Sequence, residues 1–120
     1  MTVTRFEVVS SEPLGNGELF GDAGTYTRID GIAHYAVDPE NLANVDITDL
    51  ALCERDADDR VLFNGDVTLL VPDNATKASG PLLVEVPNRG NRIAMRLLNN
   101  APADLVPSAD VNADDGHLMR

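Results

Sequence analysis

The residues best suited to chemistry are Asn88, Arg89, Gly90 and Asn91, in the segment PLLVEVPNRGNR. They follow a short apolar run, Leu82–Val86, whose composition predicts a buried β-strand, and they precede a helical pattern. A glycine-containing loop between a strand and a helix can present unpaired backbone N–H groups to an anion. We therefore take these four residues as candidates for an oxyanion loop. The N–H groups around Arg89 and Gly90 would be the donors, Asn88 could add a side-chain donor, and Arg89 could pair with an acidic group.

The alternative for the same residues is purely structural. In that interpretation Asn88 or Asn91 caps the N-terminus of the following helix, and Arg89 takes part in an ion pair. The residues alone do not separate these two interpretations, so both remain open at this point.

No residue of the chain is placed as a catalytic nucleophile. The serines lie outside any Gly-x-Ser-x-Gly frame, and none sits between a predicted strand and a predicted helix. They are Ser10, Ser11, Ser79 and Ser108. The sequence therefore predicts no catalytic residue, and no serine hydrolase complete in this chain.

The sequence patterns that could indicate a cofactor or metal site are weak. Residues 15–21, GNGELFG, have a glycine spacing one residue too long for a dinucleotide loop, and no amphipathic helix follows them. Residues 110–116, DVNADDG, resemble a calcium loop, but Asp115 stands where a glycine is needed. Cys53 is the only cysteine, and we expect it to be a small, half-buried core residue. The sequence predicts no cofactor and no bound metal.

The charge of the chain excludes some partners. Among its 120 residues, 14 Asp and 6 Glu oppose 8 Arg and 1 Lys, which gives a net charge of −11. Such a surface repels nucleic acid and anionic membranes, so we expect neither as a partner. The N-terminus has no basic region followed by a long apolar stretch, and no run reaches membrane-spanning length. These features favour a cytoplasmic protein.

Strands separated by turns are predicted for the first two thirds of the chain. The expected strands are Thr2–Val9, Thr25–Val37, Asp46–Glu54 and Val61–Val71, with a long irregular connection over Ser10–Gly24. Within Thr25–Val37, Asp30-Gly31 favours a tight hairpin turn over a bulge in one long strand. Around Asn64-Gly65 the pattern allows either a strand pair or one long bent strand. His34 is expected to be half-exposed or hydrogen-bonded.

One or two short helices complete the pattern. Apolar residues on one helical face predict a helix over Asn91–Asn99. Asp114-Asp115-Gly116 predicts a second helix start, followed by a single turn up to Arg120. We expect residues 1–120 to form one partial domain, with an incomplete sheet.

Nearly the whole chain, from about Phe6 to Arg120, resembles a group of large α/β-hydrolase domain proteins. The segments FGDAGTYTRIDGIAHYAVDPENLAN, ITDLAL, RVLFNGDVTLLVP, LLVEVPNRGNR and DDGHLMR occur in the same order as in that family. EVPNRGNR and GHLMR are the most specific of them. By this resemblance, residues 66–71 and 82–86 would be the second and third sheet strands, Asn88–Asn91 the oxyanion loop, and Asp115–Arg120 the start of the first major helix.

The resemblance implies a function that this chain cannot perform alone. It suggests the N-terminal segment of an esterase-like or acyl-hydrolase-like protein, whose nucleophile, acid and histidine have no counterparts here. His34 and His117 would both precede the nucleophile, whereas the catalytic histidine of these enzymes follows it. A small-molecule ester would be a substrate of the longer protein only, and the open sheet edge favours self-association. The alternative is a stand-alone β-rich binding or interaction module without catalysis.

Overall fold

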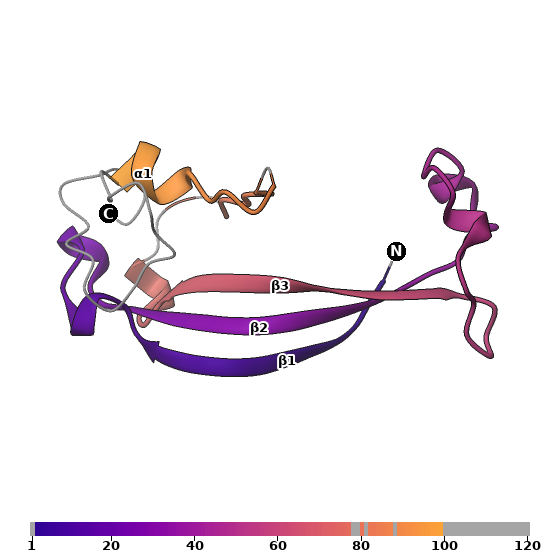
Figure 1. Ribbon diagram of the computed structural model, residues 1–120. Helices are drawn as coiled ribbons and strands as arrows, with labels where there is room; N and C mark the ends of the chain where they lie inside the picture. Colours follow the sequence, from indigo (N-terminus) through magenta and orange to yellow (C-terminus); the bar gives the residue numbers. More distant parts are fainter. Residues whose placement is uncertain (1, 78–79, 81, 88, 100–120) are drawn as a thin grey trace. The chain divides into compact units, whose positions relative to one another are not determined.

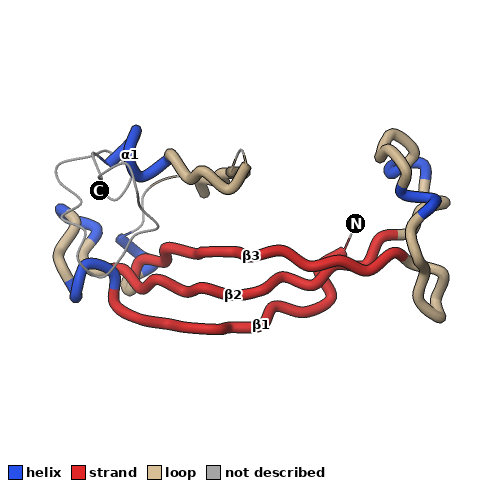
Figure 2. The backbone as a smooth tube through the Cα atoms, in the orientation of Figure 1, coloured by secondary structure: helices blue, strands red, loops and turns tan. Residues whose placement is uncertain are grey.

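The computed structural model describes residues 2–77, 80, 82–87 and 89–99. Three long strands form an open antiparallel sheet in the order β1-β2-β3 (Figures 1 and 2). They span Thr2–Pro13 (β1), Tyr26–Val37 (β2) and Val61–Pro72 (β3). The prediction of a β-rich, mainly antiparallel and incomplete sheet is thereby confirmed.

The helical elements of the described residues are short. The α-helix α1 spans Ala94–Asn99, so it begins three residues later than the predicted start at Asn91. The 3-10 turns are η1 (Leu14–Gly17), η2 (Gly21–Ala23), η3 (Leu42–Asn44), η4 (Leu50–Leu52) and η5 (Ala75–Lys77). Within the described ranges, no helix has the length and apolar character needed to cross a membrane.

The described residues divide into two compact units, one of residues 2–10 with 29–69 and one of residues 11–28 with the described part of 70–99. In the first unit the buried apolar cluster contains Val37, Leu50 and Val61. The rings of Tyr35 and Phe63 stack with their centroids 4.8 Å apart. This unit therefore has a small aliphatic core with an aromatic pair on neighbouring strands.

The prediction of a hairpin at Asp30-Gly31 is wrong, because β2 runs through both residues without a break. Asp30 is held inside the sheet, where its carboxylate accepts hydrogen bonds from Ser10 Oγ at 3.4 Å and Thr68 Oγ1 at 2.5 Å. Gly31 lies against Phe6: a Cβ at this position would stand 2.5 Å from Phe6 Cζ. The glycine thus serves a close approach between strands rather than a turn. Of the two alternatives at Asn64-Gly65, the long strand is the one observed.

The prediction of a strand over Asp46–Glu54 is also wrong. This segment folds as successive turns, with backbone N–H groups of Leu50, Leu52 and Cys53 bonded to carbonyls three residues earlier. Within these turns Leu50 is buried, while Ile47 is 42 % and Leu52 is 83 % exposed. Cys53 is exposed as well, which corrects the expectation of a half-buried core cysteine.

In the second unit the core gathers around the glycine-rich stretch after β1. Leu14, Phe20, Ala23, Tyr26 and Met95 are buried together, with Leu70 packed against them. Phe20 meets Tyr26 edge to face, with ring centroids 5.6 Å apart. The stretch predicted to be an irregular connection therefore begins as part of β1 and continues as ordered turns. Its glycines at 15, 17, 21 and 24 all have positive φ.

Candidate functional site: the loop before α1

Leu82–Val86 is not a strand in this structure, and its apolar side chains are not buried. The segment has no strand pairing and leads into the loop before α1 (Figure 2). Leu82 and Val86 are each 88 % exposed and Val84 is 71 % exposed. The prediction of a central strand buried on both faces is therefore wrong for the described residues. An apolar run of this kind is typical of a strand covered on both faces. The described sheet of β1, β2 and β3 does not cover it.

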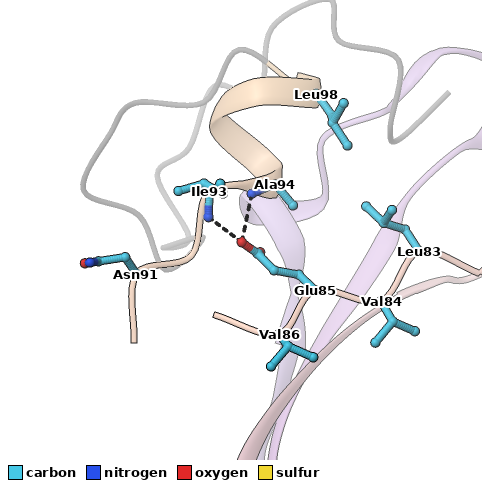
Figure 3. A pocket seen from close by; sticks show the side chains of 8 residues that line it. All are labelled: Leu83, Val84, Glu85, Val86, Asn91, Ile93, Ala94 and Leu98. Carbon is cyan, nitrogen blue, oxygen red and sulfur yellow. Dashed lines mark hydrogen bonds between the residues drawn. The ribbon is translucent and has the colours of Figure 1, made fainter. Parts of the chain in front are cut away.

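Glu85 is the residue of this segment that makes specific polar contacts. One carboxylate oxygen, Oε1, accepts hydrogen bonds from the backbone N–H groups of Ile93 at 2.6 Å and Ala94 at 3.2 Å (Figure 3). These groups belong to the start of α1, where N–H groups have no partner inside the helix. A carboxylate there also interacts favourably with the helix dipole. Glu85 therefore caps α1 from eight residues upstream of Ile93.

This contact bears on the structural interpretation of the loop, in which Asn88 or Asn91 would cap the helix. The backbone N–H groups of Ile93 and Ala94 donate to Glu85. Asn91 is exposed, and its side-chain amide is directed away from the Glu85 carboxylate (Figure 3). Asn88 lies outside the described residues. The helix cap that the sequence assigned to an asparagine is thus provided, at these two amides, by a glutamate.

Arg89 and Gly90 both have backbone conformations in the left-handed region, with φ of 52° and 79°. Such a conformation costs a non-glycine residue such as Arg89 about 1–2 kcal/mol, whereas Gly90 adopts it freely. A Cβ at Gly90 would meet nothing within 4 Å. Glycine is therefore favoured here by the backbone angle and not by crowding from the described protein atoms.

An open pocket of about 490 Å³ lies beside this loop. Leu83, Val84 and Val86 line it from the segment before the loop, and Ile93, Ala94 and Leu98 line it from α1 and the residue preceding it (Figure 3). Glu85 is the one charged residue among its lining residues, and Asn91 adds an amide. The pocket is thus an aliphatic surface with a single carboxylate that is already engaged by backbone donors.

Of the four predicted loop residues, Arg89, Gly90 and Asn91 are described: Arg89 and Gly90 form a turn, and Asn91 takes part in a single β-bridge. The sequence analysis missed Glu85. The available signal was an acidic residue within an otherwise apolar run, a few residues before a helix. Because the contact spans eight residues and depends on the path of the loop, no local capping pattern identifies it.

The other residues considered in the sequence analysis add no catalytic group to this loop. His34 is half-buried, and its Nε2 lies 3.0 Å from an Arg5 guanidinium nitrogen and 3.4 Å from Glu7 Oε2, which confirms the expected hydrogen-bonded histidine. Ser79, Ser108, His117 and residues 110–116 fall outside the described residues. Among the described residues, no three His, Cys, Asp or Glu side chains are grouped so as to hold a metal ion.

The charged turn before β3 is also structural. The Asp56 carboxylate accepts hydrogen bonds from the backbone N–H groups of Arg60 and Asp58, which lower its pKa, and the Arg60 guanidinium adds to the effect. Arg55 bonds to Glu40 and Asp59 at 2.9 Å and 3.2 Å. These arginines neutralise part of an acidic turn and leave the loop before α1 as the main candidate site.

Comparisons of this chain with protein-family models, with curated proteins and with solved structures found no match.

Proposed function

We propose that this chain is the N-terminal segment of an α/β-hydrolase-type protein of esterase or acyl-hydrolase ancestry. In this proposal the segment supplies early sheet strands and an oxyanion loop at Asn88–Asn91, and further chain supplies the nucleophile, acid and histidine. The 120 residues alone are catalytically inactive. The proposal places the protein in the cytoplasm, without a cofactor, and assigns a small-molecule ester to the longer protein.

The observation that carries the proposal is the apolar and exposed segment Leu82–Val86, a few residues before the two left-handed residues Arg89 and Gly90. Four of its five side chains are aliphatic, and three of these are more than two-thirds exposed. Burying such side chains is favourable by about 1.5–3 kcal/mol each. A segment with this composition is therefore best explained as a strand that further sheet strands would cover.

The turn supports the proposal because Arg89 and Gly90 both have positive φ. Successive backbone N–H groups in some turn conformations that include a left-handed residue form a concavity that can receive an anion. The amides of Ile93 and Ala94 are already bonded to Glu85, so the loop's own amides, at Arg89, Gly90 and Asn91, are the proposed donors.

A second candidate function, a stand-alone β-rich binding module, is favoured by one specific observation. Glu85 caps two amides at the start of α1, and Met95 of α1 packs into the buried cluster of its unit. In that case the loop would only connect Glu85 to a structural helix, and the pocket would contact a partner instead of a substrate.

The test is the DNA beyond codon 120. The first proposal predicts a continuing reading frame that encodes a Gly-x-Ser-x-Gly segment after a strand pattern. Expressed as the longer protein, it should react with a fluorophosphonate probe, and replacing the serine of that segment with alanine should abolish labelling. A frame that ends without such a segment, together with a monomeric chain that melts cooperatively, would favour the binding module.

A further inference from the structure

Glu85 joins two points of the chain that flank the candidate loop. Its Oε1 accepts from Ile93 N at 2.6 Å and Ala94 N at 3.2 Å, so one oxygen closes the chain between position 85 and positions 93 and 94 (Figure 3). Hydrogen bonds to a carboxylate are shorter and stronger than those between neutral groups. The loop residues are thereby fixed at both of their ends.

The conformation of the enclosed turn fits this closure. The chain must reverse between Glu85 and Ile93, and the left-handed residues Arg89 and Gly90 lie within that stretch. Gly90 adopts its angle without cost, whereas Arg89 does not, and the contact at Glu85 fixes the span that the turn must cross.

We propose that Glu85 is the positioning residue of the oxyanion loop: its carboxylate holds the Arg89–Asn91 backbone in the orientation in which its N–H groups face a substrate. Glu85 itself does not contact the reacting atoms. The consequence for catalysis rests on the proposed function, whereas the closure of the loop by Glu85 does not depend on it.

Substitutions at position 85 separate the hydrogen-bond acceptor from other roles of the side chain. Glu85→Gln keeps an oxygen at the same distance from the backbone, which can accept both N–H groups without the charge. Glu85→Ala removes the acceptor altogether. Glu18→Ala is a matched control, because Glu18 is an exposed glutamate of the same compact unit.

Limited trypsin digestion of the 120-residue protein reads out the closure, because Arg89 and Arg92 lie inside the closed stretch. We expect Glu85→Ala to increase the rate of cleavage after Arg89 and Arg92 by about tenfold, given the loss of hydrogen bonds to a charged group. Glu85→Gln should stay closer to the parent rate than to that of Glu85→Ala. Glu18→Ala should leave the rates unchanged, and cleavage after Arg55 and Arg60 serves as the internal reference.

Amide hydrogen exchange measured by NMR gives a second readout. The Ile93 and Ala94 amides should be protected in the parent protein and in Glu85→Gln, and should exchange faster in Glu85→Ala. Unchanged cleavage and unchanged exchange in Glu85→Ala would overturn the proposal, and so would a Glu85→Gln variant that behaves like Glu85→Ala in both assays.

In the longer protein, positioning predicts a specific kinetic pattern. Glu85→Ala should lower kcat at least tenfold with KM within about twofold, and Glu85→Gln should restore most of the activity. If the loop opens on digestion and kcat does not change, the assignment of the loop as an oxyanion site fails while the closure by Glu85 stands. If digestion shows no opening, the positioning role fails, whatever the longer protein catalyses.

Discussion

Phe6 and Gly31 approach each other so closely that no side chain fits between them. An ideal Cβ on Gly31 would lie 2.5 Å from Phe6 Cζ and 2.7 Å from the Glu7 carbonyl oxygen. The carbonyl is part of the backbone of β1 and cannot move aside without disturbing the strand. The glycine is therefore required by the pairing of β1 with β2.

Replacing Gly31 with alanine should destabilise the protein by about 1–3 kcal/mol, because the added methyl group forces the strands apart. Urea unfolding followed by circular dichroism measures this change. Gly65→Ala is the control: Gly65 also lies in a strand of the same unit, and a Cβ there meets nothing within 4 Å. Its stability should be unchanged or higher by up to about 1 kcal/mol. Equal stability of the two variants would contradict the close approach.

The Asp73 carboxylate predicts a defined acid sensitivity. Thr25 and Thr27 hydroxyls donate hydrogen bonds to it, and these bonds lower its pKa below the ordinary value of 3.8. A lowered pKa in the folded state means that this contribution to stability is complete above pH 3.8 and is lost as the pH falls through the folded value. The double variant Thr25→Val/Thr27→Val should therefore be less stable than the parent at pH 7, with a smaller difference at pH values well below 3.8.

Unfolding by urea at pH 7 and in the acidic range measures that difference. A stability difference between parent and double variant that stays constant, or grows, on acidification would show that the threonines do not act through the Asp73 charge.

Leu82–Val86 should promote self-association in solution, since its exposed aliphatic side chains present an apolar strip. Light scattering should give a mass above that of the monomer, and it should rise with salt because each chain carries a charge of −11. Leu82→Asp/Val86→Asp should restore the monomer. Leu42→Asp/Leu52→Asp replaces two leucines that are similarly exposed, at 86 % and 83 %, and should have no such effect. A monomeric parent protein under all salt conditions would exclude this role.

The 120-residue chain should have no esterase activity, because none of its serines lies in a Gly-x-Ser-x-Gly frame. Among the described serines, the Ser10 hydroxyl donates to the carboxylate of Asp30, within the sheet, and no histidine accepts its proton. Hydrolysis of short-chain aryl esters by the purified chain should equal that of a heat-denatured control. Turnover that disappears on Ser→Ala substitution at any of its serines would contradict this expectation.

The sequence predicted the sheet better than it predicted the site. Alternation and β-branched residues located β2 and β3, because such patterns reflect burial along each strand. Asp30-Gly31 was misleading, since the same dipeptide suits a hairpin turn and a close interstrand contact with Phe6, and only the partner strand distinguishes them. Asp46–Glu54 was predicted to be a strand from its pattern of apolar residues, yet it folds as turns in which Leu50 is the buried residue of η4.

At the site, Arg89 and Gly90 were identified from a turn composition that their left-handed angles now explain. Glu85 was not identified, because its bonds to Ile93 and Ala94 depend on the route of the intervening chain. Leu82–Val86 has the composition of a buried strand, but burial is a property of neighbours, and the described sheet does not cover it.

The central claim, that the loop before α1 supplies oxyanion donors, is tested most directly by the turnover number of the longer protein carrying Gly90→Val. A β-branched residue is strongly disfavoured at a φ of 79°, so the substitution should reorient the loop amides. Gly80→Val is the control, because a Cβ at Gly80 meets nothing within 4 Å and its φ is not in the left-handed region. We predict a loss of about a hundred- to a thousandfold in kcat for Gly90→Val and little change for Gly80→Val. A Gly90→Val protein that folds normally and keeps full activity would contradict the account.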